Sequence, residues 1–195
     1  GRRQRQMCIR DSFWIFTGLL VDYMEALFLF LFGNNWNSHL AHSSFINILS
    51  TVGLYLFLKE YELKSIHIIF YCLSFATLCY PLSGTPFAYI HAYIFSILAI
   101  FNLLIAIKKK NLYLWFLFPY VCFFAFLSMQ TPTAYILILL LFFTVHYFLS
   151  ERDFNNLKFF LYGCITSSLL FFFFLLLTNT PILNFIYQYI LFPIT

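Results

Sequence analysis

The chain has 195 residues, of which 63% are hydrophobic, 24% are aromatic and only 9% are charged. A soluble domain carries about 25% charged residues, so this composition excludes a soluble globular domain. The formal net charge of +4 does not indicate a nucleic-acid partner, because four of the 11 basic residues lie within the first ten positions. The composition instead predicts an all-α protein, a polytopic transmembrane helical bundle whose solvent is lipid.

The first twelve residues, GRRQRQMCIRDS, are polar and basic, unlike the rest of the chain. Back-translated, residues 2–12 resemble a transposase sequencing adapter read in frame. We therefore treat residues 1–12 as a non-native leader and exclude them from the fold. The alternative is a natural basic N-terminus before a first span. Without the leader, 7 basic and 6 acidic residues remain, and the net charge is +1.

Apolar runs separated by short polar breaks predict about six transmembrane spans within residues 39–178. Most of these runs approach the roughly 20 residues that a helix needs to cross the hydrocarbon core. Prolines and charged residues occupy the breaks, where a missing backbone N–H matters least. Pro119 is an exception that lies inside a predicted span. The predicted spans cover residues 39–58, 65–80, 87–107, 112–129, 133–149 and 159–178.

The basic residues that follow the leader occupy alternate breaks, at residues 59–64, 108–111 and 150–158. The two intervening breaks contain no Lys or Arg, and neither do the stretches before and after the six spans. Because basic loops stay in the cytoplasm, we expect these three breaks to be cytoplasmic. We expect an integral membrane protein, in the bacterial inner (plasma) membrane.

Two further segments are expected at the outer face. Residues 13–38 are predicted to form an outer interfacial helix (13–32) and a loop. Asp22 and Glu25 lie three positions apart in this helix and share one face. A lipid-facing acid at the bilayer centre costs about 2.5 kcal/mol or more, which favours an interfacial helix over another span with both acids turned inward. Residues 179–195 are expected to form an outer-face tail with a second such helix, and to be truncated at the end.

The segment over residues 16–63, with its Phe32-Gly33 turn, resembles the C superfamily of membrane glycosyltransferases, which includes the protein mannosyltransferase-like enzymes. In that family an outer amphipathic helix ends in a Phe-Gly turn, and a polar outer loop, a span and a short charged inner loop follow. The run FLSMQTPTAYILILLL is similar to a pair of spans in that family that turn through a Gln-Thr-Pro-like hinge. The tail FIYQYILFPIT resembles an outer-face helix found in some bacterial members. The resemblance implies transfer of a sugar from a polyprenyl-phosphate carrier to an acceptor at the outer face.

The chain departs from this family pattern in two respects. The family's main catalytic acid lies in the first outer loop, which the leader replaces here, so the fragment itself is expected to be inactive. The family also uses outer-face Lys or Arg to hold the carrier phosphate, but no basic residue after the leader is predicted at the outer face here. Met129 occupies the position before the hinge where the family often has Lys. The alternatives are part of a multispan transporter or flippase, which would favour polar residues at mid-membrane depth, and a polysaccharide polymerase.

Four residues are candidates for chemistry at the outer face. Asp22 and Glu25 are the acids expected outside and are candidates for catalysis, since glycosyl transfer needs a carboxylate to take the acceptor proton. Alternatively, they form the solvent-exposed polar face of an interfacial helix. His91, near the outer end of its span, and Gln130, in the hinge, are candidates for substrate binding. Alternatively, His91 packs between helices and Gln130 serves the hinge.

No metal site or cofactor is evident from the sequence, and nothing in it supports a divalent cation. His39 and His42 are three positions apart, a spacing that can place two imidazoles on one metal ion, but no third ligand accompanies them. The cysteines after the leader lack CxxC spacing and are expected to be small apolar residues. The expected partners are the lipid bilayer and, by hypothesis, a lipid-linked sugar donor, with no nucleic acid.

Overall fold

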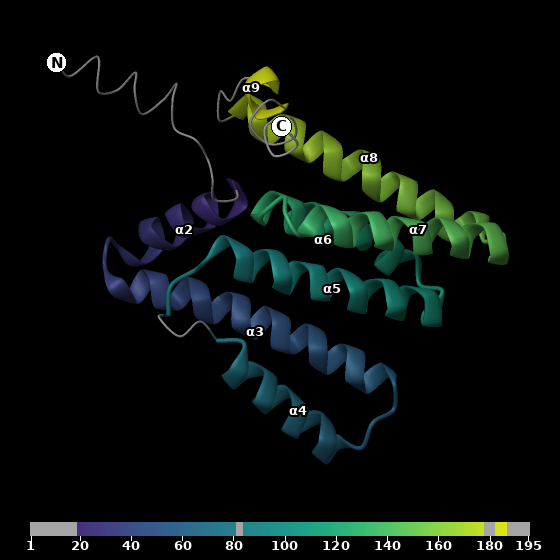
Figure 1. The fold of residues 1–195 in the computed structure, drawn as a ribbon, viewed down its shortest axis with the longest axis horizontal. Helices are drawn as coiled ribbons and strands as arrows, with labels where there is room; N and C mark the ends of the chain where they lie inside the picture. Colours follow the sequence, from purple (N-terminus) through teal and green to yellow (C-terminus); the bar gives the residue numbers. More distant parts are fainter. Residues whose placement is uncertain (1–18, 81–83, 178–181, 187–195) are drawn as a thin grey trace.

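The computed structural model describes residues 19–80, 84–177 and 182–186, and the regular elements in these ranges are all helices (Figure 1). The leader and the first residues of the predicted interfacial helix lie outside the described residues, as does most of the C-terminal tail. The helices are α2 (Leu19–Phe32), α3 (Trp36–Glu60), α4 (Ser65–Leu78), α5 (Ala88–Lys109), α6 (Leu112–Ser128), α7 (Thr133–Glu151), α8 (Phe154–Leu177) and α9 (Ile182–Ile186).

Helices α3 to α8 coincide with the six predicted spans, and four of them have the length and apolarity of a membrane-crossing helix. These four are α3, α5, α7 and α8, with 25, 22, 19 and 24 residues. The two others, α4 and α6, are apolar but have only 14 and 17 residues. At 1.5 Å per residue they extend about 21 and 26 Å, less than the roughly 30 Å of the hydrocarbon core. The all-helical class is therefore confirmed for the described residues, with four membrane-length helices.

The last predicted span begins five residues earlier than expected, at Phe154. Arg152 turns the chain in the left-handed region with φ of 50°. Asp153 then accepts a hydrogen bond from the backbone N–H of Asn156 at 3.2 Å, which satisfies a donor in the first turn of α8. A tight turn and a side-chain cap thus replace the broad loop predicted over 150–158.

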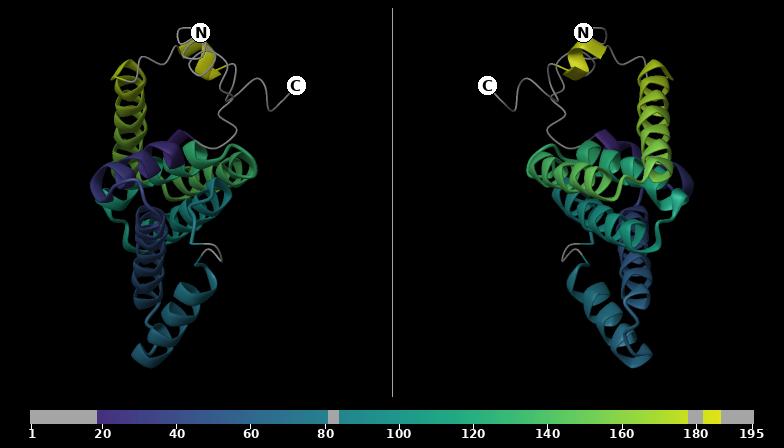
Figure 2. Two further views of the ribbon diagram at one scale, coloured as in Figure 1. Left: turned by 90° about the vertical axis from the view of Figure 1, so that its left-hand side faces the viewer. Right: turned by 90° about the vertical axis from the view of Figure 1, so that its right-hand side faces the viewer.

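Helix α6 lies at the centre of the bundle, packed along α5 on one side and along α8 on another (Figure 1). Helix α3 packs on α5, and α4 lies against α3 at the edge (Figures 1 and 2). Trp115 on α6 is fully buried, and its ring stacks on Tyr147 and packs against Phe148, with ring centroids 5.2 and 4.7 Å apart. Because aromatic side chains bury large apolar areas, this contact stabilises the end of the bundle away from α2.

Gly163 allows α8 to lie close against α6. A Cβ atom at this position would overlap the backbone carbonyl oxygen of Phe116 and would lie 3.1 Å from Cγ of Pro119. A carbonyl oxygen within a helix is held by the backbone, so it moves only if the helix moves. The contact between these two helices therefore depends on the absence of a side chain at residue 163.

We expect Gly163→Ala to lower the free energy of unfolding by about 1–3 kcal/mol, the usual cost of overpacking. The measurement is thermal unfolding of the purified protein in detergent, followed by circular dichroism. Gly53→Ala is the matched control, because a Cβ there meets only the end of the Leu98 side chain, which can rotate away. Equal losses in the two variants would show that the α6–α8 approach is not as close as described.

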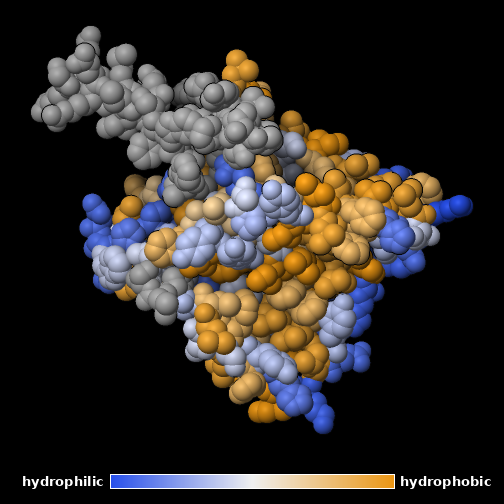
Figure 3. All heavy atoms as spheres, viewed as in Figure 1, coloured by the Kyte–Doolittle hydropathy of each residue, from blue (hydrophilic) through white to orange (hydrophobic). Residues whose placement is uncertain are grey.

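Polar side chains gather at two opposite ends of the bundle, and a broad apolar belt separates them (Figure 3). At one end, Nζ of Lys109 lies 2.5 Å from Oε2 of Glu60, and Nζ of Lys110 donates to Oε2 of Glu151 at 2.9 Å. The Glu151 carboxylate, by accepting this hydrogen bond, raises the pKa of Lys110. The Lys110 amine therefore stays charged at neutral pH. The stability that its ion pair with Glu151 contributes to the fold is lost only as the pH rises through that raised pKa.

The described part of helix α2 has 14 residues, about 21 Å at 1.5 Å per residue, compared with the roughly 30 Å of the hydrocarbon core. It runs obliquely to α3 at the end of the bundle where α3 begins (Figures 1 and 2), and it packs against α3 and α6. Its outward side chains Tyr23, Leu27 and Phe30 are 41, 53 and 85% exposed. A short helix with an exposed apolar face is consistent with the predicted interfacial position.

Candidate functional site

A tight turn after α2 folds that helix back against the first turns of α3. Gly33 has φ of 84°, a left-handed conformation that glycine adopts without strain. The side-chain oxygen of Asn35 accepts a hydrogen bond from Ser38 N at 3.2 Å and caps α3, while its amide donates to Phe32 O at 2.8 Å. One asparagine thus joins the end of α2 to the start of α3, and the inner face of α2 comes to lie over α3.

Four ionisable side chains meet beneath this turn, and we call them the histidine cluster: Glu25 of α2, His39 and His42 of α3, and His91 of α5. The Glu25 carboxylate bridges two rings, with Oε2 lying 2.5 Å from Nδ1 of His42 and Oε1 lying 2.5 Å from Nδ1 of His39. The contact with His42 is a hydrogen bond. The contact with His39 is as short but less well aligned, and the buried Oε1 accepts no well-directed hydrogen bond. At such separations one of the two facing atoms has to carry a proton.

The inner half of the cluster is almost completely buried, since His42 and His91 are 0 and 1% exposed. Nε2 of His42 lies 3.1 Å from Nε2 of His91. Nδ1 of His91 donates to the backbone oxygen of Phe87 at 2.8 Å. The Phe28 ring stacks on His42 with centroids 4.9 Å apart. Every nitrogen of the two buried rings therefore has a polar partner, as buried polar groups require.

The outer half of the cluster is open to solvent. The side chains of His39 and Glu25 are 32 and 17% exposed. Trp36, which is 56% exposed, lies beside His39 with ring centroids 5.6 Å apart. A carboxylate that holds Nδ1 of an imidazole leaves Nε2 of the same ring as the proton acceptor. The arrangement of Glu25 and His39 can therefore take a proton from a hydroxyl group at this end of the bundle.

Two of the four sequence candidates, Glu25 and His91, lie in the cluster, joined through His42. Asp22 lies on the same helix as Glu25 but is exposed. Side chains three residues apart in an α-helix point about 60° away from each other around the helix axis, and the side of α2 that carries Glu25 is the side that faces α3. Gln130 lies half-buried in the turn between α6 and α7, where its backbone oxygen accepts from Ala134 N at 2.8 Å. Within the described ranges, no hydrogen bond joins Gln130 to the cluster.

Sequence reasoning considered His39 and His42 only as possible metal ligands and did not pair them with an acid. The structure supplies Glu25 as a third group, but its two oxygens bind the two rings separately. In the part of the chain that the structure describes, no three His, Cys, Asp or Glu side chains are arranged to hold a metal ion. The spacing of the two histidines was a usable signal, and the missing information was the turn that brings α2 onto α3.

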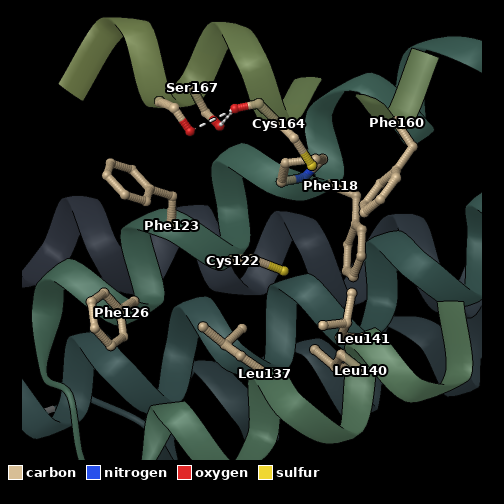
Figure 4. A pocket seen from close by; sticks show the side chains of 12 residues that line it. Phe118, Cys122, Phe123, Phe126, Leu137, Leu140, Leu141, Phe160, Cys164 and Ser167 are labelled. Carbon is tan, nitrogen blue, oxygen red and sulfur yellow. Dashed lines mark hydrogen bonds between the residues drawn. The ribbon is translucent and has the colours of Figure 1, made fainter. Parts of the chain in front are cut away.

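A cavity of about 300 Å³ lies between α6, α7 and α8 (Figure 4). Phe123, Phe126 and Leu137 are among the aromatic and aliphatic side chains that line it, and no lining residue is charged. The Ser167 hydroxyl donates to the backbone oxygen of Cys164 at 3.1 Å, so it is satisfied within its own helix. The cavity therefore offers apolar surface and little polar recognition.

Helices α3 and α5, which carry the histidines of the cluster, and the apolar cavity lie on different faces of α6. Its residues Phe124 and Ala125 pack toward α3 and α5, whereas Phe123 and Phe126 face the cavity.

Comparisons of the chain with protein-family models, with curated proteins and with solved structures gave no match.

Proposed function

We propose that this chain is part of a membrane glycosyltransferase that moves a sugar from a polyprenyl-phosphate carrier to an acceptor hydroxyl at the outer face of the membrane. The observation that carries the proposal is the pairing of Glu25 with His39. This pair lies at one end of an apolar bundle, in a half-exposed position that an acceptor can reach. It supplies the acid–base chemistry that the reaction needs at that membrane surface.

In this reaction His39 acts as the general base and Glu25 as a positioning residue. Nε2 of His39 takes the proton of the acceptor hydroxyl while the hydroxyl oxygen bonds to the anomeric carbon of the sugar. The bond between that carbon and the phosphate oxygen breaks, and polyprenyl phosphate leaves with the electron pair. Glu25 keeps the other ring proton on Nδ1 and stabilises the imidazolium that forms.

The charge distribution supports an outer position for the cluster. The basic residues after the leader lie in the three turns at the far end of α3, α5 and α7, whereas the cluster lies where α3 and α5 begin. Under the positive-inside rule, the basic end faces the cytoplasm of a bacterial plasma membrane. In this arrangement α4 and α6 serve as two short spans beside the four long ones. The basic residues are Lys59, Lys64, Lys108, Lys109, Lys110, Arg152 and Lys158.

The apolar cavity supports a lipid-linked donor. A polyprenyl chain has no polar groups, so apolar surface within the membrane-length helices suits it. Phe126 lines the cavity and lies within one turn of Ser128, the end of α6. A chain that lies in the cavity would therefore lead its phosphate toward the same end of the bundle as the histidine cluster.

The test is donor consumption by the protein in lipid nanodiscs. A polyprenyl-phosphate hexose with a radiolabelled sugar is incubated with peptide and oligosaccharide acceptors, and transferred label is counted against empty nanodiscs. A second sample includes the upstream segment that the gene encodes, because the resemblance implies that the family's main acid lies before α2. Transfer in either sample supports the proposal, and no donor consumption in both would overturn it.

A second candidate function is proton-coupled transport, which the buried contact between His42 and His91 favours. Ionisable side chains inside membrane helices often form proton relays. The measurement is the decay of a pH gradient across liposomes that contain the protein and a pH-sensitive dye. A transporter would speed this decay when its substrate is added, whereas a glycosyltransferase would leave it unchanged.

A further inference from the structure

The hydrogen bonds of the histidine cluster determine how many protons it holds. A backbone carbonyl only accepts, so Nδ1 of His91, 2.8 Å from Phe87 O, carries a proton. A neutral imidazole carries one proton in all, so neutral His91 presents a bare lone pair at Nε2. Neutral His42 does the same if its Nδ1 donates to an ionised Glu25 at 2.5 Å. Two bare lone pairs would then face each other across 3.1 Å.

Such lone pairs repel, so one further proton has to be present. If it lies on Nε2 of His42 or of His91, one ring is an imidazolium beside a carboxylate. If it lies on Oε2 of Glu25, the carboxyl group donates to His42, and His42 donates to His91. We infer that Glu25, His42 and His91 share one proton along a buried chain. All these arrangements make the trio electrically neutral, which is the form that burial favours.

Among the residues that the structure describes, the shared proton reaches solvent only at the Glu25 end of this hydrogen-bonded chain. At the other end, Phe87 O accepts hydrogen bonds from both N and Nδ1 of His91, at 3.2 and 2.8 Å, and a carbonyl oxygen does not pass a proton on. Glu25 is partly exposed and contacts His39, which is 32% exposed. The cluster therefore exchanges its proton with the face of the bundle on which His39 lies.

The hydrogen-bonded chain does not continue along α3 or α5 toward the basic end of the bundle. After His42, α3 carries no ionisable side chain before Tyr55, about 20 Å further along the helix axis at 1.5 Å per residue. After Tyr93, α5 carries none before Lys108, a gap of about 22 Å. On α2 and on the first turns of α3 and α5, the other titratable side chains are exposed: Asp22, Tyr23, Tyr89 and Tyr93.

One consequence rests on the proposed function, whereas the shared proton does not. If His39 is the base, the shared proton balances the charge of Glu25 in the resting cluster. When it lies on His42 or His91, Glu25 is ionised and can stabilise the His39 imidazolium that forms. In this role His42 and His91 are positioning residues, and they act on the acceptor only through Glu25.

The test counts protons directly, in protein labelled with ¹⁵N-histidine and held in lipid nanodiscs at pH 7. Ring ¹⁵N signals show how many protons His42 and His91 carry, and the infrared band of a protonated carboxyl shows the state of Glu25. We expect one proton beyond those of two neutral rings and a carboxylate. Two neutral rings beside an ionised Glu25, or two imidazolium rings, would overturn the inference. His67→Gln serves as the control, since it removes an exposed histidine.

The variants Glu25→Gln and Glu25→Ala give a second, independent readout. A glutamine amide can donate to His42 as a protonated carboxyl does, so neither ring needs an extra proton. We expect Glu25→Gln to keep both rings neutral and to shift the unfolding midpoint by less than about 3 °C, and Glu25→Ala to lower it by about 5–10 °C. Equal losses in the two variants would show that Glu25 acts only as an anion.

Proton flux separates this inference from the proposed function. Liposomes that contain the protein and an internal pH-sensitive dye are expected to hold a pH gradient as long as liposomes without protein do. The reason is that the hydrogen-bonded chain exchanges its proton with solvent at one face of the bundle only. A faster decay without any added substrate would contradict the one-sided path. Since none of these measurements uses a sugar donor, the inference and the glycosyltransferase proposal can fail separately.

Discussion

In the sample that transfers sugar, His39→Gln is expected to lower the rate of transfer by about 10²–10⁴-fold, the usual contribution of a general base. Glutamine has a similar reach and polarity but no nitrogen that takes up a proton near neutral pH. The donor should still bind, because His39 contacts Glu25 and Trp36 and is not among the residues that line the apolar cavity. The loss should therefore fall on kcat and leave KM nearly unchanged.

The matched control is His67→Gln, which changes an exposed histidine on α4 and should leave the rate unchanged. The division of the loss between kcat and KM adds a readout, since a purely structural loss would not fall on kcat alone. A variant that keeps the wild-type rate would remove His39 from the mechanism.

His42→Leu is expected to lower the free energy of unfolding by about 2–4 kcal/mol, because it removes one hydrogen-bond partner from each of two neighbouring side chains. Glu25 loses the partner of its Oε2, and His91 loses the partner of its buried Nε2. Leucine is close to histidine in volume, so packing against Phe28 should largely persist. The expected fall in the unfolding midpoint is about 5–15 °C for a chain of this size.

The control for this prediction is His146→Leu, since His146 lies exposed on α7 and should tolerate an apolar side chain. The double variant Glu25→Leu/His42→Leu should be more stable than His42→Leu alone, because it also removes the carboxylate whose Oε2 lost its hydrogen bond to His42. If the two losses simply add, Glu25 and His42 do not form the coupled pair described here.

Much of the fold could be predicted from the sequence. The apolar runs and the breaks between them predicted the positions of α3 to α8, most of them to within two residues at each end. This succeeded because in lipid every backbone N–H and C=O has to bond within its own helix, so a long apolar run has few alternatives. The start of α8 was wrong by five residues, because a single side chain, Asp153, caps the helix where composition suggested a loop.

The candidate site was predicted only in part. Glu25 and His91 were among the candidates, but so were Asp22 and Gln130, which lie outside the cluster. The rotation of α2 about its own axis decided between Asp22 and Glu25, and the two lie on adjacent edges of the helix. That rotation depends on the turn at Gly33 and Asn35 and on the packing of α2 against α3 and α6.

The sequence by itself determined the class of the protein, because hydropathy and charge act locally along the chain and do not depend on how helices are arranged. Only the tertiary structure decided that Glu25, His39, His42 and His91 meet. Glu25 and His91 are 66 positions apart, and they are linked through hydrogen bonds of 2.5 and 3.1 Å to the same ring, His42. A proton is shared only over such distances, and they depend on how three helices are turned and packed together.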